Sequence, residues 1–175
     1  LLHQTKILRE IRMAKTLDGP AAQVSLNWPK AIAEKKKVVD RLVRGVEFLL
    51  TGNKVELVRG EAFLLEGRKV AVRTSDGDEK VYEAEAVILA HGSRPAELPF
   101  LKFDGTDILS STEMLELAAP PKTLVVIGAG AIGLEMGTIY SRLGTEVTVV
   151  EILASALPGC DKEMGQRFEL VLKKQ

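Results

Sequence analysis

TLVVIGAGAIGLE, residues 123–135, joins a short apolar run to three glycines and the start of a helical pattern. The β-branched residues 125–127 predict a buried strand of the parallel-sheet type. Gly128 can take the dihedral angles of the tight turn after this strand, Gly130 allows a pyrophosphate to approach the backbone, and Gly133 allows the helix to pack closely on the strand. The N-terminus of that helix favours an anion, because its N–H groups are free and its dipole end is positive. The stretch therefore predicts a dinucleotide-binding turn.

The residues after the glycines extend this pattern to a βαβ unit. We expect a helix over about 131–143, stopping at Gly144, and a second apolar strand over 147–150. Glu151 stands at the end of that strand, about twenty residues beyond the glycines. A carboxylate there can accept hydrogen bonds from both ribose hydroxyls and repels a 2′-phosphate, which favours NAD over NADP. The alternative is a plain βαβ unit whose glycines serve packing alone.

The composition is that of a soluble globular protein. The 175 residues are 46% hydrophobic, and 24 basic residues balance 24 acidic ones, so charge gives no reason to expect nucleic acid or an anionic membrane as partner. No apolar run is long enough to span a bilayer, and the N-terminal residues do not resemble a signal peptide. Cys160, the only cysteine, cannot pair within the chain, so we expect a reducing compartment: the cytoplasm, or the mitochondrial matrix in a eukaryote.

Two amphipathic helices are predicted before the glycine stretch. The first covers 1–16 and ends at Asp18-Gly19-Pro20, and the second covers about 28–51. Asn27 is the expected N-cap of the second helix, and its lysine triplet, 35–37, is interpreted as a solvated face. The apolar positions of the second helix form one stripe: Val39, Leu42, Val43, Val46, Leu49 and Leu50.

From residue 54 the hydrophobic period changes to two. Extended segments are expected over 55–65, 69–74 and 79–83, and the last two flank the turn sequence at 75–78. Together they predict a small antiparallel meander. The continuous apolar run at 86–90 predicts a further, buried strand.

Residues 96–121 are predicted to be rich in loops. One short helix is expected over 111–117, with Ser111 or Thr112 as its cap. Four prolines lie between 95 and 121, and we place a domain boundary near 118–121.

Several stretches together resemble one family. AVILAHGSRP, residues 86–95, is similar to the A-T-G-S-x-P signature that closes the first flavin-binding segment of the pyridine nucleotide-disulfide oxidoreductases. The unit from Gly128 to Glu151 resembles their NAD-binding segment, and Leu1-Leu2-His3 resembles the residues just after their redox-active cysteines. Within the family, the order of elements is most similar to the central part of the dihydrolipoamide dehydrogenases. Mercuric reductase, soluble transhydrogenase and glutathione reductase share this layout, and a non-catalytic nucleotide-binding module remains a further alternative.

The resemblance implies a partial α/β fold of the Rossmann-like, two-domain FAD/NAD(P)-binding class. Residues 1–118 would be the later part of an FAD-binding domain, and 119–175 the first βαβ half of an inserted NAD-binding domain. We therefore expect an internal segment of a longer protein. The FAD contacts implied are Gly60, Glu61 and Ala62 near the adenine, and Ala90, His91 and Gly92 near the flavin. The NAD contacts implied are Gly128, Ala129, Gly130, Ala131, Ile132, Gly133, Glu135, Val150 and Glu151, with Glu135 toward the nicotinamide.

The activity implied is electron transfer from a dithiol through a disulfide and FAD to NAD+. The dithiol would be a small molecule or a lipoyl domain, and the full-length protein a homodimer. The paired redox cysteines and the C-terminal His-Glu pair of the family are absent, so no catalytic residue and no metal ligand is assigned and the isolated chain is expected to be inactive. Cys160 and His3 match no catalytic position of the family. His91 stands where the family has threonine, and its ring could serve a function beside the cofactor or simply pack at the end of a strand.

Overall fold

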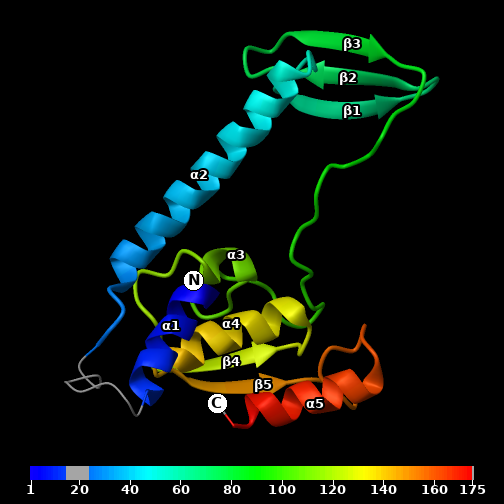
Figure 1. Ribbon diagram of the computed structural model, residues 1–175. Helices are drawn as coiled ribbons and strands as arrows, with labels where there is room; N and C mark the ends of the chain where they lie inside the picture. Colours follow the sequence, from blue (N-terminus) through cyan, green and yellow to red (C-terminus); the bar gives the residue numbers. More distant parts are fainter. Residues whose placement is uncertain (15–23, 175) are drawn as a thin grey trace. The chain divides into compact units, whose positions relative to one another are not determined.

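A computed structural model describes residues 1–14 and 24–174 (Figure 1). These residues belong to two compact units. The first unit consists of Leu1–Lys37 and Pro95–Gln175, and the second of Val38–Arg94. The domain boundary near 118–121 stays a prediction.

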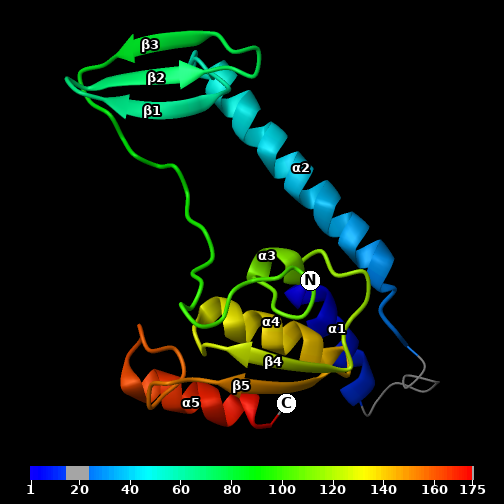
Figure 2. The same cartoon turned by 180° about the vertical axis from the view of Figure 1, so that it is seen from behind.

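A parallel βαβ arrangement organises the first unit. Strand β4 (Thr123–Ile127) pairs in parallel with β5 (Glu146–Val150), in a register that places Ile127 opposite Val150. Helix α4 (Ala131–Arg142) connects them and lies along the strand pair in both views (Figures 1 and 2). Gly144, with φ of +98°, ends the helix in the left-handed region, as the glycine predicted. Helix α5 (Lys162–Leu172) comes next, and the predicted βαβ unit is confirmed.

The core of the first unit gathers segments that are far apart in the sequence. Its buried cluster consists of Trp28, Met114, Ile139 and Tyr140, contributed by α2, α3 and α4. The Trp28 and Tyr140 rings lie 5.7 Å apart, and the Trp28 indole N–H donates to the carbonyl of Leu117 at 2.8 Å. The buried Tyr140 hydroxyl donates to the carbonyl of Met114. These contacts hold the start of α2 and the short α3 on the βαβ unit.

The long predicted helices are present. Helix α1 is Leu2–Met13, and its predicted end at Asp18-Gly19-Pro20 lies outside the described residues. Helix α2 is Trp28–Gly52, and the Asn27 side chain accepts the N–H of Lys30 at 3.0 Å, which confirms the expected N-cap. Most of the apolar stripe of α2 is exposed, including Leu42 at 64%. The stripe therefore adds little to the core that the described residues form.

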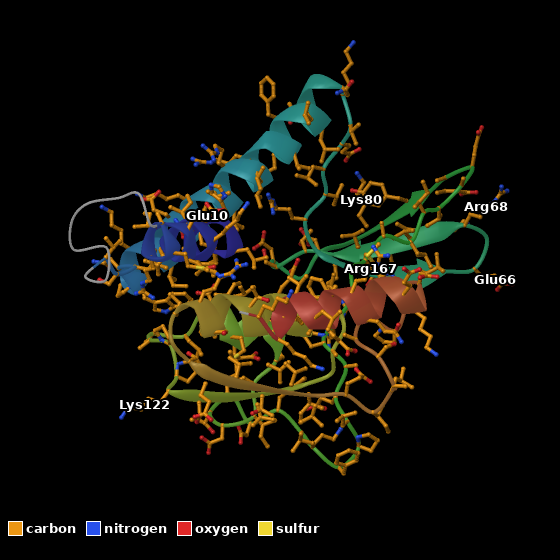
Figure 3. All side chains as sticks on the ribbon, turned by 60° about the horizontal axis from the view of Figure 1, so that its bottom comes forward. Glu10, Glu66, Arg68, Lys80, Lys122 and Arg167 are labelled. Atoms are coloured by element: carbon orange, nitrogen blue, oxygen red, sulfur yellow. The ribbon has the colours of Figure 1, made fainter. Side chains whose placement is uncertain are left out.

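The meander predicted from the alternating pattern is the sheet of the second unit. Its strands β1 (Glu61–Leu65), β2 (Lys69–Arg73) and β3 (Glu79–Glu83) are antiparallel in the order β1-β2-β3. The turn between β2 and β3 contains Gly77 at φ +88°, as the hairpin chemistry requires. Figure 3 shows Glu66 and Arg68 pointing outward from the turn between β1 and β2.

Two predicted strand segments are wrong. Residues 55–59 and 86–90 have no strand conformation, and Ile88 is 89% exposed. A strand needs a neighbour that takes its backbone N–H and C=O groups, and within the described residues neither segment has one. Hydrophobic pattern alone therefore did not decide their structure.

The short helix before β4 is also shifted from its prediction. Helix α3 is Ser111–Met114, shorter than the predicted 111–117, and its N-cap is Ser110 instead of Ser111 or Thr112. The Ser110 backbone N–H donates to the Glu113 carboxylate at 2.7 Å, and its hydroxyl accepts the N–H of Thr112 at 3.1 Å. This is a capping box, and it starts one residue earlier because Glu113 stands three residues beyond Ser110.

Candidate dinucleotide site

The turn after β4 is fixed by the conformation of one glycine. Gly128 has φ of +102°, a left-handed conformation that side chains other than hydrogen disfavour. Its N–H donates to the carbonyl of Val150 at 2.8 Å, so the turn is fastened to the end of β5. The end of β4, the end of β5 and the start of α4 therefore meet at one place.

The other two glycines of the loop differ in what surrounds them. A Cβ built on Gly133 would lie 2.3 Å from the carbonyl oxygen of Gly128 and 3.1 Å from Cγ1 of Val126, so a side chain there would collide with the strand. A Cβ on Gly130 would meet nothing within 4 Å. Packing accounts for Gly133 and backbone conformation for Gly128, whereas the space over Gly130 is the feature that a ligand approaching the backbone would need.

The N-terminus of α4 has the properties of an anion site. Gly130 is its N-cap, with φ of −74° and ψ of 175°, and no side chain of the described residues caps it. No acidic residue lies in the first turn of α4, so the helix itself supplies no carboxylate to its positive dipole end. Ala131 and Ile132 are exposed in this turn, and Glu135 is exposed one turn further on.

Glu151 contacts the glycine loop directly. Its carboxylate accepts the N–H of Ala129 at 2.7 Å and the N–H of Leu153 at 2.9 Å. The Leu153 N–H first, and then the Ala129 N–H, lower the pKa of Glu151 below its ordinary value. An ionised carboxylate offers about four lone-pair sites, so these two bonds leave capacity for ribose hydroxyls. Glu151 thus stands beside the loop, as its place after the second strand predicted.

Residues that sequence reasoning did not assign support the loop from the C-terminal side. The Leu157 N–H donates to the carbonyl of Ala129 at 2.8 Å, and the Ala156 N–H donates to the Glu169 carboxylate at 2.8 Å. Ala129, Leu134 and Ala156 form a small buried cluster behind the loop. No spacing in the sequence signals these contacts, because they depend on how α5 folds back.

The residues predicted to contact FAD lie in the second unit. A Cβ on Gly60 would lie 2.5 Å from the carbonyl oxygen of Arg73, so the meander itself already requires glycine there. Glu61 and Ala62 are exposed on β1, and residues 90–92 are exposed in a segment without regular structure, with Gly92 at φ +80°. In the described part of the chain, no hydrogen bond links these two stretches. Their contact with FAD stays a prediction.

The comparison with known protein families gives one clear match. The model of the pyridine nucleotide-disulphide oxidoreductases matches residues 3–175. The chain belongs to this family. The family assignment predicted from the sequence is thereby confirmed.

Individual relatives agree with this assignment. Dihydrolipoyl dehydrogenase 2, mitochondrial, from Arabidopsis thaliana is 41% identical over 176 residues, which cover 100% of this chain and 35% of the relative. Dihydrolipoyl dehydrogenase from Bacillus subtilis is 36% identical over 176 residues, which cover 99% of this chain and 38% of the Bacillus protein. The crystal structure of LpdA from Mycobacterium tuberculosis superimposes with a TM-score of 0.85 at 26% identity, over 99% of this chain and 38% of that one. This match confirms the predicted fold class.

The chain thus spans little more than a third of the length of these relatives. This share agrees with the expectation that the chain is a segment of a longer protein. None of the helices in residues 1–14 and 24–174 is long and apolar enough to cross a membrane.

Proposed function

We propose that this chain supplies the NAD-binding turn and part of the flavin-binding wall of a dihydrolipoyl dehydrogenase-like enzyme. The enzyme would pass electrons from a dithiol through a disulfide and FAD to NAD+. The relatives named dihydrolipoyl dehydrogenase support this reaction, and the open space over Gly130 at the uncapped N-terminus of α4 is the observation that carries the NAD site.

Each residue of the loop has a distinct task in this proposal. Gly128 sets the turn, and Gly133 holds α4 against β4 so that its N-terminus faces the phosphates. The backbone at Gly130 would receive the pyrophosphate, and the Glu151 carboxylate would accept the ribose hydroxyls while repelling a 2′-phosphate. The redox chemistry itself is supplied by the two cofactors when they are bound. The chain provides their alignment and no catalytic side chain.

The remaining assignments belong to the same proposal. Ala131, Ile132, Glu135 and Val150 would complete the NAD site, and residues 60–62 and 90–92 would lie against FAD. The dithiol would be a small molecule or a lipoyl domain, and the full-length protein a homodimer. We place it in the cytoplasm, or in the mitochondrial matrix in a eukaryote.

The cofactor preference tests this proposal. We expect the chain to bind NADH at least tenfold more tightly than NADPH, and Glu151→Arg to reverse that preference, because the substitution replaces repulsion of a 2′-phosphate by a charge-assisted hydrogen bond. Fluorescence titration with NADH and NADPH measures both constants. Glu151→Gln is the matched control, since it removes the charge but keeps the size and should leave little preference for either cofactor.

A second substitution tests the glycine loop independently of selectivity. Gly130→Ala should weaken both nucleotides alike, because its methyl group occupies the space through which the pyrophosphate approaches. Unchanged selectivity in Glu151→Arg together with full binding in Gly130→Ala would rule out this site.

A further inference from the structure

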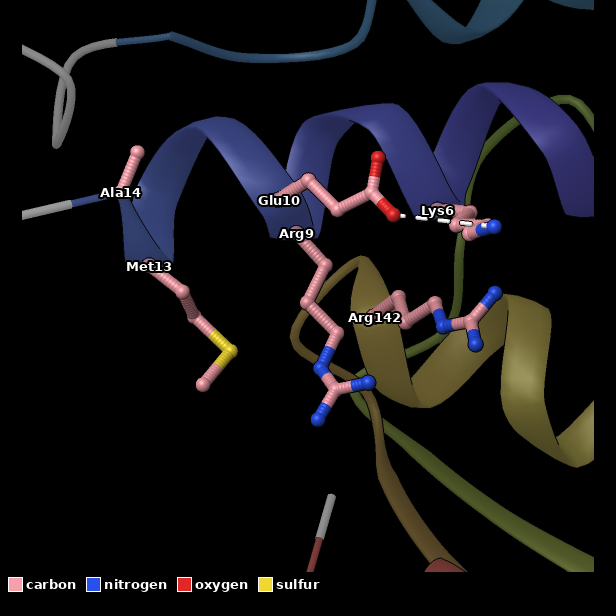
Figure 4. A pocket seen from close by; sticks show the side chains of 6 residues that line it. All are labelled: Lys6, Arg9, Glu10, Met13, Ala14 and Arg142. Atoms are coloured by element: carbon pink, nitrogen blue, oxygen red, sulfur yellow. Dashed lines mark ion pairs between the residues drawn. The ribbon is translucent and has the colours of Figure 1, made fainter. Parts of the chain in front are cut away.

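A hollow of the first unit lies between α1 and α4. Its volume is about 310 Å³, and Figure 4 shows the side chains that line it: Lys6, Arg9, Glu10, Met13 and Ala14 from α1, and Arg142 from α4. Arg142 is the last residue of α4, so the hollow lies roughly 16 Å along the helix from the glycine loop at its other end. It is therefore separate from the proposed NAD site.

The charge of this hollow is strongly one-sided. Three cations, Lys6, Arg9 and Arg142, face one carboxylate, Glu10, which lies 3.6 Å from the Lys6 ammonium, and the net charge is +2. The chain as a whole is neutral, so this excess is local. A hollow with a net positive charge that is bounded by protein concentrates anions.

The two arginines are held close enough to affect each other. The Arg142 guanidinium donates to the carbonyl of Leu2 at 3.5 Å, which keeps it against α1. Burial is the main cause that lowers the pKa of Arg142, and the charge of Arg9 lowers it further. The charge of Glu10 acts in the opposite direction and raises this pKa. Like charges facing a shared space are stabilised by an anion between them.

We propose that this hollow binds a phosphate group, with Arg9 and Arg142 as its principal ligands and Lys6 at its rim. A phosphate monoester carries a charge of about −1.5 to −2 near pH 7, which matches the charge of the hollow. Planar guanidinium forks suit phosphate oxygens better than a single ammonium does. The wall formed by Met13, which is 65% exposed, and Ala14 gives an apolar group carried by the phosphate a surface to contact.

Titration calorimetry of the 175-residue chain with inorganic phosphate, in a buffer without phosphate, tests the proposal. We expect saturable binding that Arg9→Gln weakens about tenfold or more, because a charge-assisted hydrogen bond is lost. Arg12→Gln is the matched control, since Arg12 stands on the same helix, donates to the carbonyl of Val24 instead and does not line the hollow. Glu10→Gln should strengthen binding about two- to fivefold, because it removes an exposed opposing charge.

The gain expected for Glu10→Gln cannot arise from misfolding, so it keeps the test decisive if Arg9→Gln folds poorly. Phenyl phosphate provides a further arm. Tighter binding of phenyl phosphate than of inorganic phosphate identifies an ester with an apolar group as the ligand, and equal binding identifies the phosphate group alone. The proposal is overturned if phosphate shows no saturable binding, or if Arg12→Gln weakens phosphate binding as much as Arg9→Gln does. It is also overturned if Gly130→Asp abolishes phosphate binding while Arg9→Gln leaves it unchanged, because the phosphate would then bind at the glycine loop.

Discussion

Replacing Gly133 by alanine isolates the close contact between α4 and the turn after β4. The added Cβ would lie 2.3 Å from the Gly128 carbonyl oxygen, whereas an ordinary carbon–oxygen contact is about 3.3 Å. The backbone must therefore shift by roughly 1 Å, and overpacking of this kind costs about 1–3 kcal/mol. Gly137→Ala is the matched control on the same helix, because its Cβ would meet Val147 at an ordinary 3.4 Å.

Both substitutions replace a glycine of α4 by alanine, a change that favours a helix interior by about 0.5–1 kcal/mol, so the difference between the two variants is dominated by the collision at Gly133. We expect Gly137→Ala to raise the free energy of unfolding, and Gly133→Ala to lie about 1–3 kcal/mol below it. Urea unfolding monitored by the fluorescence of Trp28, the only tryptophan and part of the core of the first unit, is the assay. Equal stabilities of the two variants would refute the reasoning.

Three other features of the first unit make separate predictions. Ser110→Ala should lower the free energy of unfolding by about 1 kcal/mol through loss of the N-cap, whereas Ser111→Ala, at the neighbouring position, should change it far less when both are measured by urea unfolding. Tyr140→Phe leaves the buried Met114 carbonyl without its donor and should lower the free energy of unfolding by about 1–3 kcal/mol. In the unsubstituted protein, burial raises the pKa of Tyr140 to about 12, which an absorbance titration can check. Backbone N–H groups, above all that of Ile108, lower the pKa of Asp104 to about 2. The ionised Asp104 carboxylate therefore stabilises the fold fully above its ordinary pKa of 3.8, and this contribution is lost as the pH falls through 2. An NMR titration of the Asp104 carboxyl carbon that gave an ordinary pKa would contradict this.

The βαβ unit was predictable because its signals are local. A run of β-branched residues, a glycine in a left-handed turn and a helix ended by Gly144 each act within a few residues, and the parallel pairing results from the crossover helix. The family resemblance was carried by the same local motifs. The meander was predictable for a similar reason, since its strands are neighbours in sequence.

The errors arose where structure depends on a partner. Residues 55–59 and 86–90 have strand-like sequences, but no strand of the described residues pairs with them. The cap of α3 differed by one residue, because Ser110 and Ser111 are equivalent in composition and only the position of Glu113 distinguishes them.

By itself, the sequence determined the family, the glycine turn and the place of Glu151 at the end of β5, because these depend on backbone conformation and short spacings. Only the tertiary structure decided which atoms enforce the glycine roles predicted from the sequence: the Gly128 carbonyl oxygen and Val126 face Gly133, and nothing lies within 4 Å of a Cβ built on Gly130. The hydrogen bond from Ala129 to Glu151 and the meeting of Arg9 with Arg142 were likewise decided there. These contacts join residues more than twenty positions apart. The parallel pairing of β4 with β5 brings Ala129 to Glu151, and the packing of α1 against α4 brings Arg9 to Arg142.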